Sequence, residues 1–161
     1  MDKPLIMVVD DEPEMTNFIV DTIKESEKYD TVPAYSAKEA FDQLRKHRQL
    51  LGLAGNRIKL ILLDIKMPEM DGLQFLEKLR QDFNEENLGV LMVTAYEDEE
   101  KWDRATSGFV CGYIKKPITK ANLFAKLDLF FSNPDARCKM TLDTFEKHID
   151  KREELRGQKK D

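Results

Sequence analysis

Three aspartates of this chain directly follow predicted strands, where an α/β sheet binds its ligands. Asp64 directly follows an aliphatic run at residues 60–63. Asp10 and Asp11 follow a similar run at residues 5–9. Aliphatic runs without polar alternation are typical of strands buried on both faces, and open α/β sheets bind ligands beyond the carboxyl ends of such strands. The pattern makes Asp64 a candidate reaction centre, while an aspartate that caps the next turn is the plain alternative.

Two later apolar runs also end in polar residues. Thr94 follows residues 90–93, and the pair Lys115-Lys116 follows residues 109–114. Side chains alternate along a strand, so only one of the two lysines should face the same side as the carboxylates. Thr94 has an ordinary alternative, because threonine is a good strand residue and can cap the next helix.

Strand-like and helix-like segments alternate along the sequence. Apolar, β-branched runs predict strands, and apolar residues spaced three or four apart predict helices. Alternation of this kind indicates an α/β fold in which helices cover both faces of a parallel sheet through right-handed crossovers. The acidic, threonine and lysine positions would then share the carboxyl edge. The predicted strands are residues 5–9, 31–35, 58–63, 90–93 and 109–114, and the predicted helices are 13–26, one from Ser36, one from Asp71, 97–107 and 119–131.

The composition fits one domain with a charged surface. The chain has 161 residues, of which 41% are hydrophobic and 35% are charged. No apolar run approaches the roughly 20 residues that cross a bilayer, and no secretory signal is expected, so we predict no membrane association. The two cysteines lack metal-ligand spacing and favour a reducing cytoplasm. A net charge of −5 argues against nucleic-acid binding.

Four motifs stand at predicted strand ends: Asp10-Asp11, Leu63-Asp64-Ile65-Lys66-Met67-Pro68-Glu69-Met70-Asp71-Gly72, Thr94-Ala95 and Tyr113-Ile114-Lys115-Lys116-Pro117. In this order they resemble the receiver domain of bacterial two-component response regulators (CheY-like). The likeness covers residues 4–132. It implies a five-stranded parallel sheet in the flavodoxin-like order 2-1-3-4-5. It also implies a receiver domain at residues 1–132. Residues 133–161 lie beyond it and are predicted to form a helical extension.

The resemblance implies a phosphorylation site. Asp64 would be the phospho-acceptor, since an aspartate can attack phosphorus and form an aspartyl phosphate. Three carboxylates in one pocket repel one another unless a cation is present, and magnesium prefers oxygen ligands. Asp11 and Asp64 would bind Mg²⁺ directly, with Asp10 in support. The backbone carbonyl of Lys66 would be a further ligand. Lys116, directly before the proline, matches the lysine of the family pattern and leaves Lys115 as an exposed charge.

The same resemblance implies a switch. The Thr94 hydroxyl would donate to a phosphoryl oxygen on Asp64, and the vacated space would admit Tyr113, although Tyr113 could equally be a half-buried aromatic on an edge strand. The readout surface would be the helix at residues 97–107 with the strand and helix that follow. Lys66 and Tyr96 would tune how long the phosphoryl group survives, with Tyr96 shielding it from water.

The predicted function is that of a response regulator phosphorylated by a histidine kinase or a phosphotransfer protein. No output domain is expected to follow, and signalling would run through an unknown downstream protein or a phosphorelay. The alternatives are a receiver fragment of a larger regulator and a pseudo-receiver that keeps only the fold. A magnesium-dependent phosphohydrolase of the haloacid-dehalogenase type is disfavoured. Such enzymes need an acidic residue two positions after the nucleophile, where this chain has Lys66.

The C-terminal tail is not explained by the resemblance. Leu142, Phe145 and Ile149 form a stripe at helical spacing within residues 141–156. The stripe is too short to predict a coiled coil. A helix that docks on the domain or frays, a dimerisation or partner-binding helix, and a linker to an output domain all stay open. A dimer could form through residues 97–131 or through this helix.

Overall fold

The computed structural model describes residues 2–48, 56–83, 88–95 and 109–158. Within these ranges all strands join one parallel sheet, as predicted. The strand order is β2 (Asp30–Ala34), β1 (Leu5–Val9), β3 (Ile58–Asp64), β4 (Gly89–Thr94) and β5 (Gly112–Lys115). This is the order 2-1-3-4-5, so the predicted fold class is confirmed. β2, which contains Pro33, is an edge strand, where a missing amide donor is tolerated.

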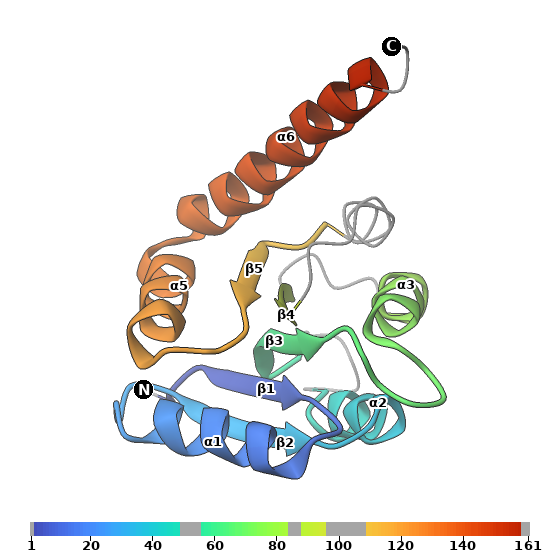
Figure 1. Cartoon of the computed structure of the whole chain (residues 1–161). Helices are drawn as coiled ribbons and strands as arrows, with labels where there is room; N and C mark the ends of the chain where they lie inside the picture. Colours follow the sequence, from blue (N-terminus) through green and yellow to red (C-terminus); the bar gives the residue numbers. More distant parts are fainter. Residues whose placement is uncertain (1, 49–55, 84–87, 96–108, 159–161) are drawn as a thin grey trace.

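Helices cover both faces of the sheet (Figure 1). α1 (Pro13–Lys24) and α5 (Lys120–Ser132) lie on one face. α2 (Ala37–Lys46) and α3 (Gly72–Asp82) lie on the other. The helix predicted at residues 97–107 lies outside the described residues. In the described ranges, no helix combines the length and the apolar character that crossing a membrane would require.

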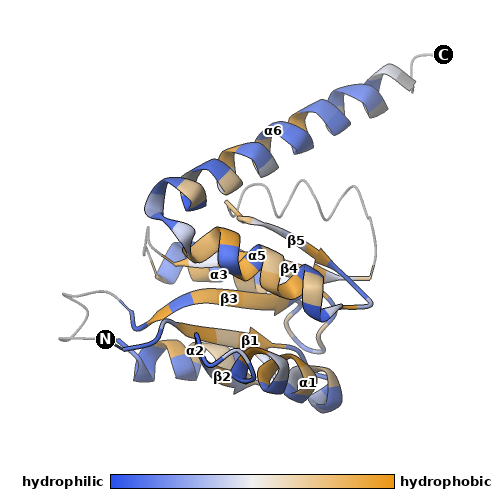
Figure 2. Ribbon diagram, turned by 90° about the vertical axis from the view of Figure 1, so that its left-hand side faces the viewer, coloured by the Kyte–Doolittle hydropathy of each residue, from blue (hydrophilic) through white to orange (hydrophobic). Residues whose placement is uncertain are grey.

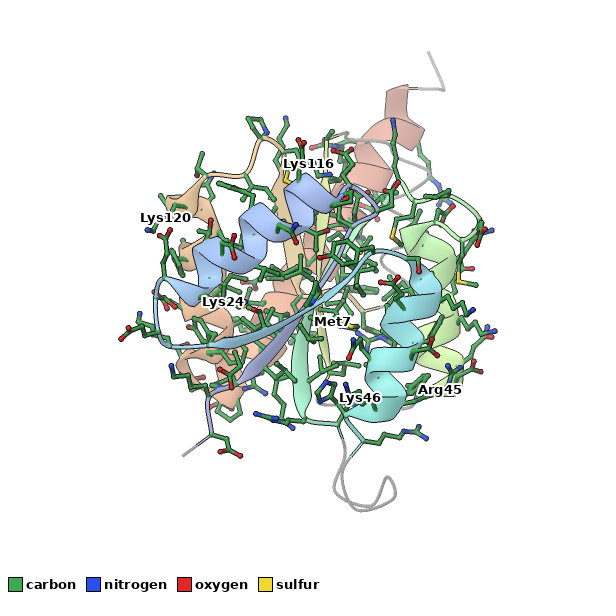
Figure 3. The ribbon with its side chains drawn as sticks, turned by 90° about the horizontal axis from the view of Figure 1, so that it is seen from below. Met7, Lys24, Arg45, Lys46, Lys116 and Lys120 are labelled. Atoms are coloured by element: carbon green, nitrogen blue, oxygen red, sulfur yellow. The ribbon has the colours of Figure 1, made fainter. Side chains whose placement is uncertain are left out.

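The sheet is buried on both sides, which accounts for the unbroken aliphatic runs. In β1, Met7 and Val9 point into the core shared with α2 and α3, whereas Ile6 and Val8 point into the core shared with α1 and α5. Met7 lies between the two helical layers in Figure 3, and Figure 2 shows the apolar residues concentrated in the strands. Each such side chain contributes about 1.5–3 kcal/mol when fully buried.

Two helix starts are fixed by side-chain caps. The Ser36 hydroxyl accepts a hydrogen bond from the amide of Glu39, and the Glu39 carboxylate accepts one from the amide of Tyr35. At the start of α3, Asp71 and Gln74 form a reciprocal capping box. These caps satisfy amides that have no partner inside the helix. The second cap sets where the chain turns back after β3.

One position on α1 differs from the sequence prediction. Apolar spacing alone would place Phe18 on the buried face with Ile19 and Ile23, but Phe18 is 49% exposed. Thr16 and Val20 are buried instead. Residues 16, 19, 20 and 23 follow the helical repeat of three and four, so Phe18 falls outside that stripe.

A long C-terminal helix, α6 (Pro134–Gln158), follows α5 directly and confirms the predicted helical extension. Its part up to His148 packs against α5 and β5, and its C-terminal end projects away from the domain (Figure 1). Met140 is buried on the docked side. The predicted stripe is not the docked face, because Leu142, Phe145 and Ile149 are 56%, 40% and 38% exposed.

Candidate functional site

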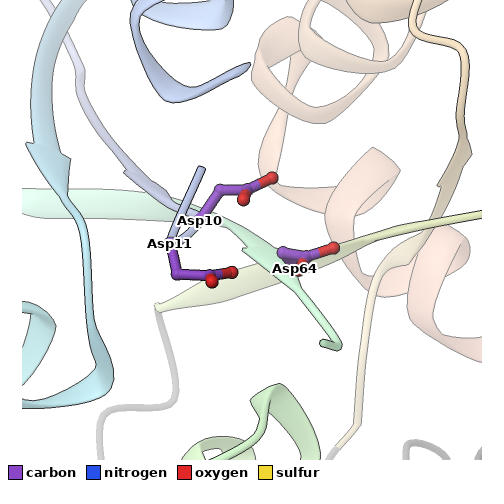
Figure 4. Close-up of side chains that lie close together, drawn as sticks. All are labelled: Asp10, Asp11 and Asp64. Atoms are coloured by element: carbon purple, nitrogen blue, oxygen red, sulfur yellow. The ribbon is translucent and has the colours of Figure 1, made fainter. Parts of the chain in front are cut away.

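Three carboxylates meet at the carboxyl edge of the sheet. Val9 is in register with Leu63, so the residues that follow them, Asp10 and Asp64, come side by side. Asp11 joins them from the same turn. One oxygen atom of each carboxylate lies within 4.8 Å of the other two. Figure 4 shows the three side chains gathered at this point. Asp10 and Asp64 are buried and Asp11 is half-buried.

One ammonium group bridges two of these carboxylates. Lys116 Nζ lies 3.0 Å from Asp10 Oδ2 and 3.1 Å from Asp64 Oδ1. The Lys116 side chain is only 15% exposed, so these ion pairs are poorly screened by water. Lys115 is exposed, in agreement with the alternation of side chains along β5. The structure therefore brings Lys116, and not Lys115, to the acidic cluster.

Backbone and helix contacts hold Asp10 in place. Its Oδ1 accepts a hydrogen bond from the Glu12 amide at 2.9 Å. Its carbonyl oxygen accepts one from the Thr16 hydroxyl at 2.8 Å, and its amide donates to the Ala34 carbonyl at 3.2 Å. Thr16 is not among the site residues predicted from the sequence. The signal was present, because Thr16 occupies a buried position of the α1 repeat, three residues before Ile19.

A glycine allows α3 to start against the backbone of Asp64. The Gly72 amide donates to the Ile65 carbonyl at 2.8 Å. A Cβ atom at Gly72 would lie 2.1 Å from the Asp64 carbonyl oxygen, which is far inside van der Waals contact. Only glycine therefore fits this position without a shift of the loop that carries Asp64. The sequence indicated Gly72 as part of a helix start but not this contact.

The charges of the cluster are not balanced. Burial, followed by the charge of Asp10, raises the pKa of Asp64 from 3.8 to about 6, and Lys116 offsets only part of the effect. Burial acts to lower the pKa of Lys116, but its hydrogen bonds and charge interactions with Asp10 and Asp64 outweigh burial and raise it. Three carboxylates thus face one ammonium, and oxygen donors suit a hard divalent cation. The residues present fit a magnesium ion held by Asp10, Asp11 and Asp64.

The two predicted switch residues lie at different positions along neighbouring strands, with Thr94 nearer the carboxyl edge than Tyr113. Thr94 ends β4, and its carbonyl oxygen accepts a hydrogen bond from the Lys116 amide at 2.9 Å. Tyr113 is in register with Met92, two residues before Thr94. Its ring is half-buried, and burial raises the pKa of its hydroxyl. The structure thus joins Thr94 to the cluster through Lys116 and sets Tyr113 further down β5, against His148 of α6.

The residues predicted to tune dephosphorylation are only partly described. Lys66 lies two residues after Asp64, and its side chain is exposed. Tyr96, like the readout helix at residues 97–107, lies outside the described residues. The predicted roles of Lys66 and Tyr96 stay predictions.

Comparison with known proteins gives consistent matches. The model of the response regulator receiver domain family matches residues 6–128. A chemotaxis protein CheY homologue of Campylobacter jejuni is 31% identical over 123 residues, which cover 76% of this chain and 88% of that protein. The hybrid signal transduction histidine kinase D of Dictyostelium discoideum is 31% identical over 125 residues, which cover 78% of this chain but 7% of the kinase.

The fold comparison agrees with the sequence matches. The crystal structure of the chemotaxis protein CheY4 of Vibrio cholerae superimposes with a TM-score of 0.68. It covers 78% of this chain and 97% of that chain at 22% sequence identity, and at this identity the likeness concerns the fold.

Proposed function

The chain belongs to the response regulator receiver domain family of two-component signal transduction, and from this premise we propose that Asp64 accepts a phosphoryl group from a histidine kinase or a phosphotransfer protein. One observation carries the proposal. Lys116 bridges Asp10 and Asp64, with Asp11 within reach of the same space. The nucleophile, the candidate metal ligands and a cation thus converge, as phosphoryl transfer to a carboxylate requires.

In the proposed reaction, a carboxylate oxygen of Asp64 attacks the phosphorus atom of a phosphohistidine. The P–O bond to Asp64 forms as the P–N bond breaks, and the imidazole leaves with the electron pair and takes up a proton. The reaction needs Asp64 ionised. Since the pKa of Asp64 is about 6, the carboxyl group is ionised in most molecules at neutral pH even without a metal.

The other residues hold charge and position. Asp10, Asp11, Asp64 and the backbone carbonyl of Lys66 would hold the magnesium ion. When bound, magnesium supplies positive charge near the phosphoryl oxygens. The Lys116 ammonium already lies 3.1 Å from Asp64, so it can turn to a phosphoryl oxygen with little reorganisation. Gly72 fixes the loop that presents Asp64.

The phosphoryl group would then act on the surface through Thr94 and Tyr113. It adds a charge of about −1.5 to −2 and new acceptor oxygens. The Thr94 hydroxyl would donate to one of these oxygens, and its side chain would move towards the phosphoryl group. Tyr113 would follow into the vacated space. Lys66 and Tyr96 would control the access of water to the phosphoryl group.

Beryllofluoride, which mimics a phosphoryl group on aspartate, tests the proposal. Titration calorimetry in the presence of magnesium should show one binding event per chain for the wild type. Asp64→Asn should abolish it. Asp82→Asn, on the exposed end of α3, should bind like the wild type. Absence of binding in the wild type, or unchanged binding in Asp64→Asn, would contradict the proposal.

A further inference from the structure

α6 covers the outer edge of the sheet. β5 is the last strand in the described sheet, and an edge strand presents backbone groups that other chains can pair with. The Thr144 hydroxyl lies 3.3 Å from the carbonyl oxygen of Cys111, just before β5, and 2.7 Å from the Met140 carbonyl of its own helix. The Thr141 hydroxyl lies 3.5 Å from the Cys111 sulfur. α6 thus lies directly on the start of the edge strand.

Two anchors, one of them buried and one half-buried, fasten the first part of α6 to α5. Met140 is 6% exposed and belongs to the same core cluster as Leu127 and Phe130. The Arg137 guanidinium lies 4.8 Å from the centre of the Phe130 ring, and its Nε donates to the Phe130 carbonyl at 3.3 Å. These contacts combine burial, a cation–π contact and a hydrogen bond. They make the docking of α6 specific rather than incidental.

A third anchor reaches the proposed switch residue. His148 is 5% exposed, and its ring lies 5.4 Å from the ring of Tyr113 at an angle of 55°. Aromatic pairs at this distance contribute beyond their buried area. Tyr113 therefore touches α6 on one side and packs on the core of the sheet on the other. It cannot change its position without changing what His148 contacts.

We propose that α6 is a built-in cover for the β5 edge and that phosphorylation of Asp64 releases it. The inference rests on the proposed function, because the signal enters through Thr94 and Tyr113. When Tyr113 moves, His148 loses its ring contact, and the hold of α6 on β5 weakens. Release exposes the edge of β5 and the inner face of α6, formed by Met140, Thr144 and His148.

The coupling must work in both directions. If the phosphorylated state disfavours docking, then a docked α6 disfavours the phosphorylated state by the same factor. Weakening the dock should therefore strengthen the binding of beryllofluoride. His148→Ala removes the ring contact and leaves Asp64, Thr94 and Tyr113 in place. Lys147→Ala, one residue earlier on the exposed side of α6, is the matched control.

Hydrogen exchange of the full chain, followed by mass spectrometry, measures the docking. With magnesium alone, amides of α6 around residues 140–148 should be protected in the wild type and in Lys147→Ala. Addition of beryllofluoride should speed their exchange by on the order of tenfold. His148→Ala should exchange fast without beryllofluoride, and its affinity for beryllofluoride should rise several-fold.

The two proposals fail in different ways. If calorimetry shows that beryllofluoride binds through Asp64 but the exchange of α6 stays unchanged, release of α6 is wrong and the proposed function stands. If His148→Ala keeps both the protection of α6 and the wild-type affinity, His148 is not the link and the inference is overturned. If beryllofluoride does not bind the wild type, the proposed function fails and the inference fails with it.

Discussion

Lys116 Nζ lies 3.1 Å from Asp64 Oδ1, although the two residues come from the ends of β5 and β3 with β4 between them. The same ammonium lies 3.0 Å from Asp10 at the end of β1. The parallel sheet alone makes this meeting possible, because it brings three strand ends to one edge. A half-buried cation is thereby held beside a carboxylate whose pKa is raised.

Replacement of Lys116 by alanine should slow phosphorylation strongly. The change removes the cation that neutralises charge near Asp64, and the loss of one such group typically costs a factor of about 10²–10³ in rate. The measurement is the rate of phosphorylation by acetyl phosphate with magnesium. Lys115→Ala, whose side chain is exposed, is the control and should react at the wild-type rate. Equal rates for the two variants would contradict the role of Lys116.

Replacement of Asp64 by asparagine should stabilise the metal-free protein near neutral pH. The pKa of Asp64 is about 6 in the folded protein and 3.8 ordinarily, so the folded state prefers the protonated carboxyl group. This preference stabilises the fold fully below pH 3.8, and the stabilisation is lost as the pH rises through 6. Above that range the charged carboxylate costs about 1–3 kcal/mol, which asparagine removes.

Denaturant unfolding with a chelator present checks this expectation. Asp64→Asn should have the higher free energy of unfolding at pH 7.5, and the gain should be clearly smaller at pH 4.5. Asp82→Asn controls for the loss of one negative charge. A gain of the same size at both pH values would show that the carboxylate environment is not its cause.

A methyl group at position 72 should damage both the stability and the site. Gly72→Ala places a Cβ atom 2.1 Å from the Asp64 carbonyl oxygen, and the backbone must move to relieve the overlap. We expect a loss of about 1–3 kcal/mol in the free energy of unfolding together with weaker magnesium binding. Gly157→Ala is the matched control, because nothing lies within 4 Å of its added Cβ atom. Tryptophan or tyrosine fluorescence during magnesium titration gives the second readout.

Loss of the Thr16 hydroxyl should weaken magnesium binding at the acidic cluster. Thr16→Val leaves the Asp10 carbonyl without its 2.8 Å donor, at a cost of about 1–3 kcal/mol, and loosens the turn that carries Asp10 and Asp11. Magnesium affinity should fall. Thr22→Val removes a comparable hydroxyl, which donates to the Phe18 carbonyl further along α1, and should leave magnesium affinity unchanged. Equal affinities in the two variants would remove Thr16 from the account.

The sheet and the strand-end residues could be predicted from the sequence because both depend on local patterns. An aliphatic run of four or five residues identifies a buried strand, and the first polar residue after it marks the carboxyl edge. Asp10 and Asp64 are of this kind, whereas Lys116 is the second residue after its run. The choice of Lys116 over Lys115 needed the alternation of side chains as well as the family pattern.

Other features depend on contacts that a sequence pattern does not contain. The overlap at Gly72 exists only because α3 starts against the Asp64 backbone. The docked face of α6 contains Thr144 and His148, which no apolar pattern in the sequence identifies. The apolar stripe that the sequence does show, with Phe145, is exposed. Their packing is decided by the edge of β5, far away in the sequence.

The most direct test is to locate the phosphoryl group. The wild type is treated with acetyl phosphate and magnesium, the acyl phosphate is reduced with borohydride, and the peptides are sequenced by mass spectrometry. We predict that the reduced residue is Asp64, that magnesium is required, and that Asp64→Asn carries no modification. Modification at another carboxylate, or none in the wild type with magnesium present, would contradict the account.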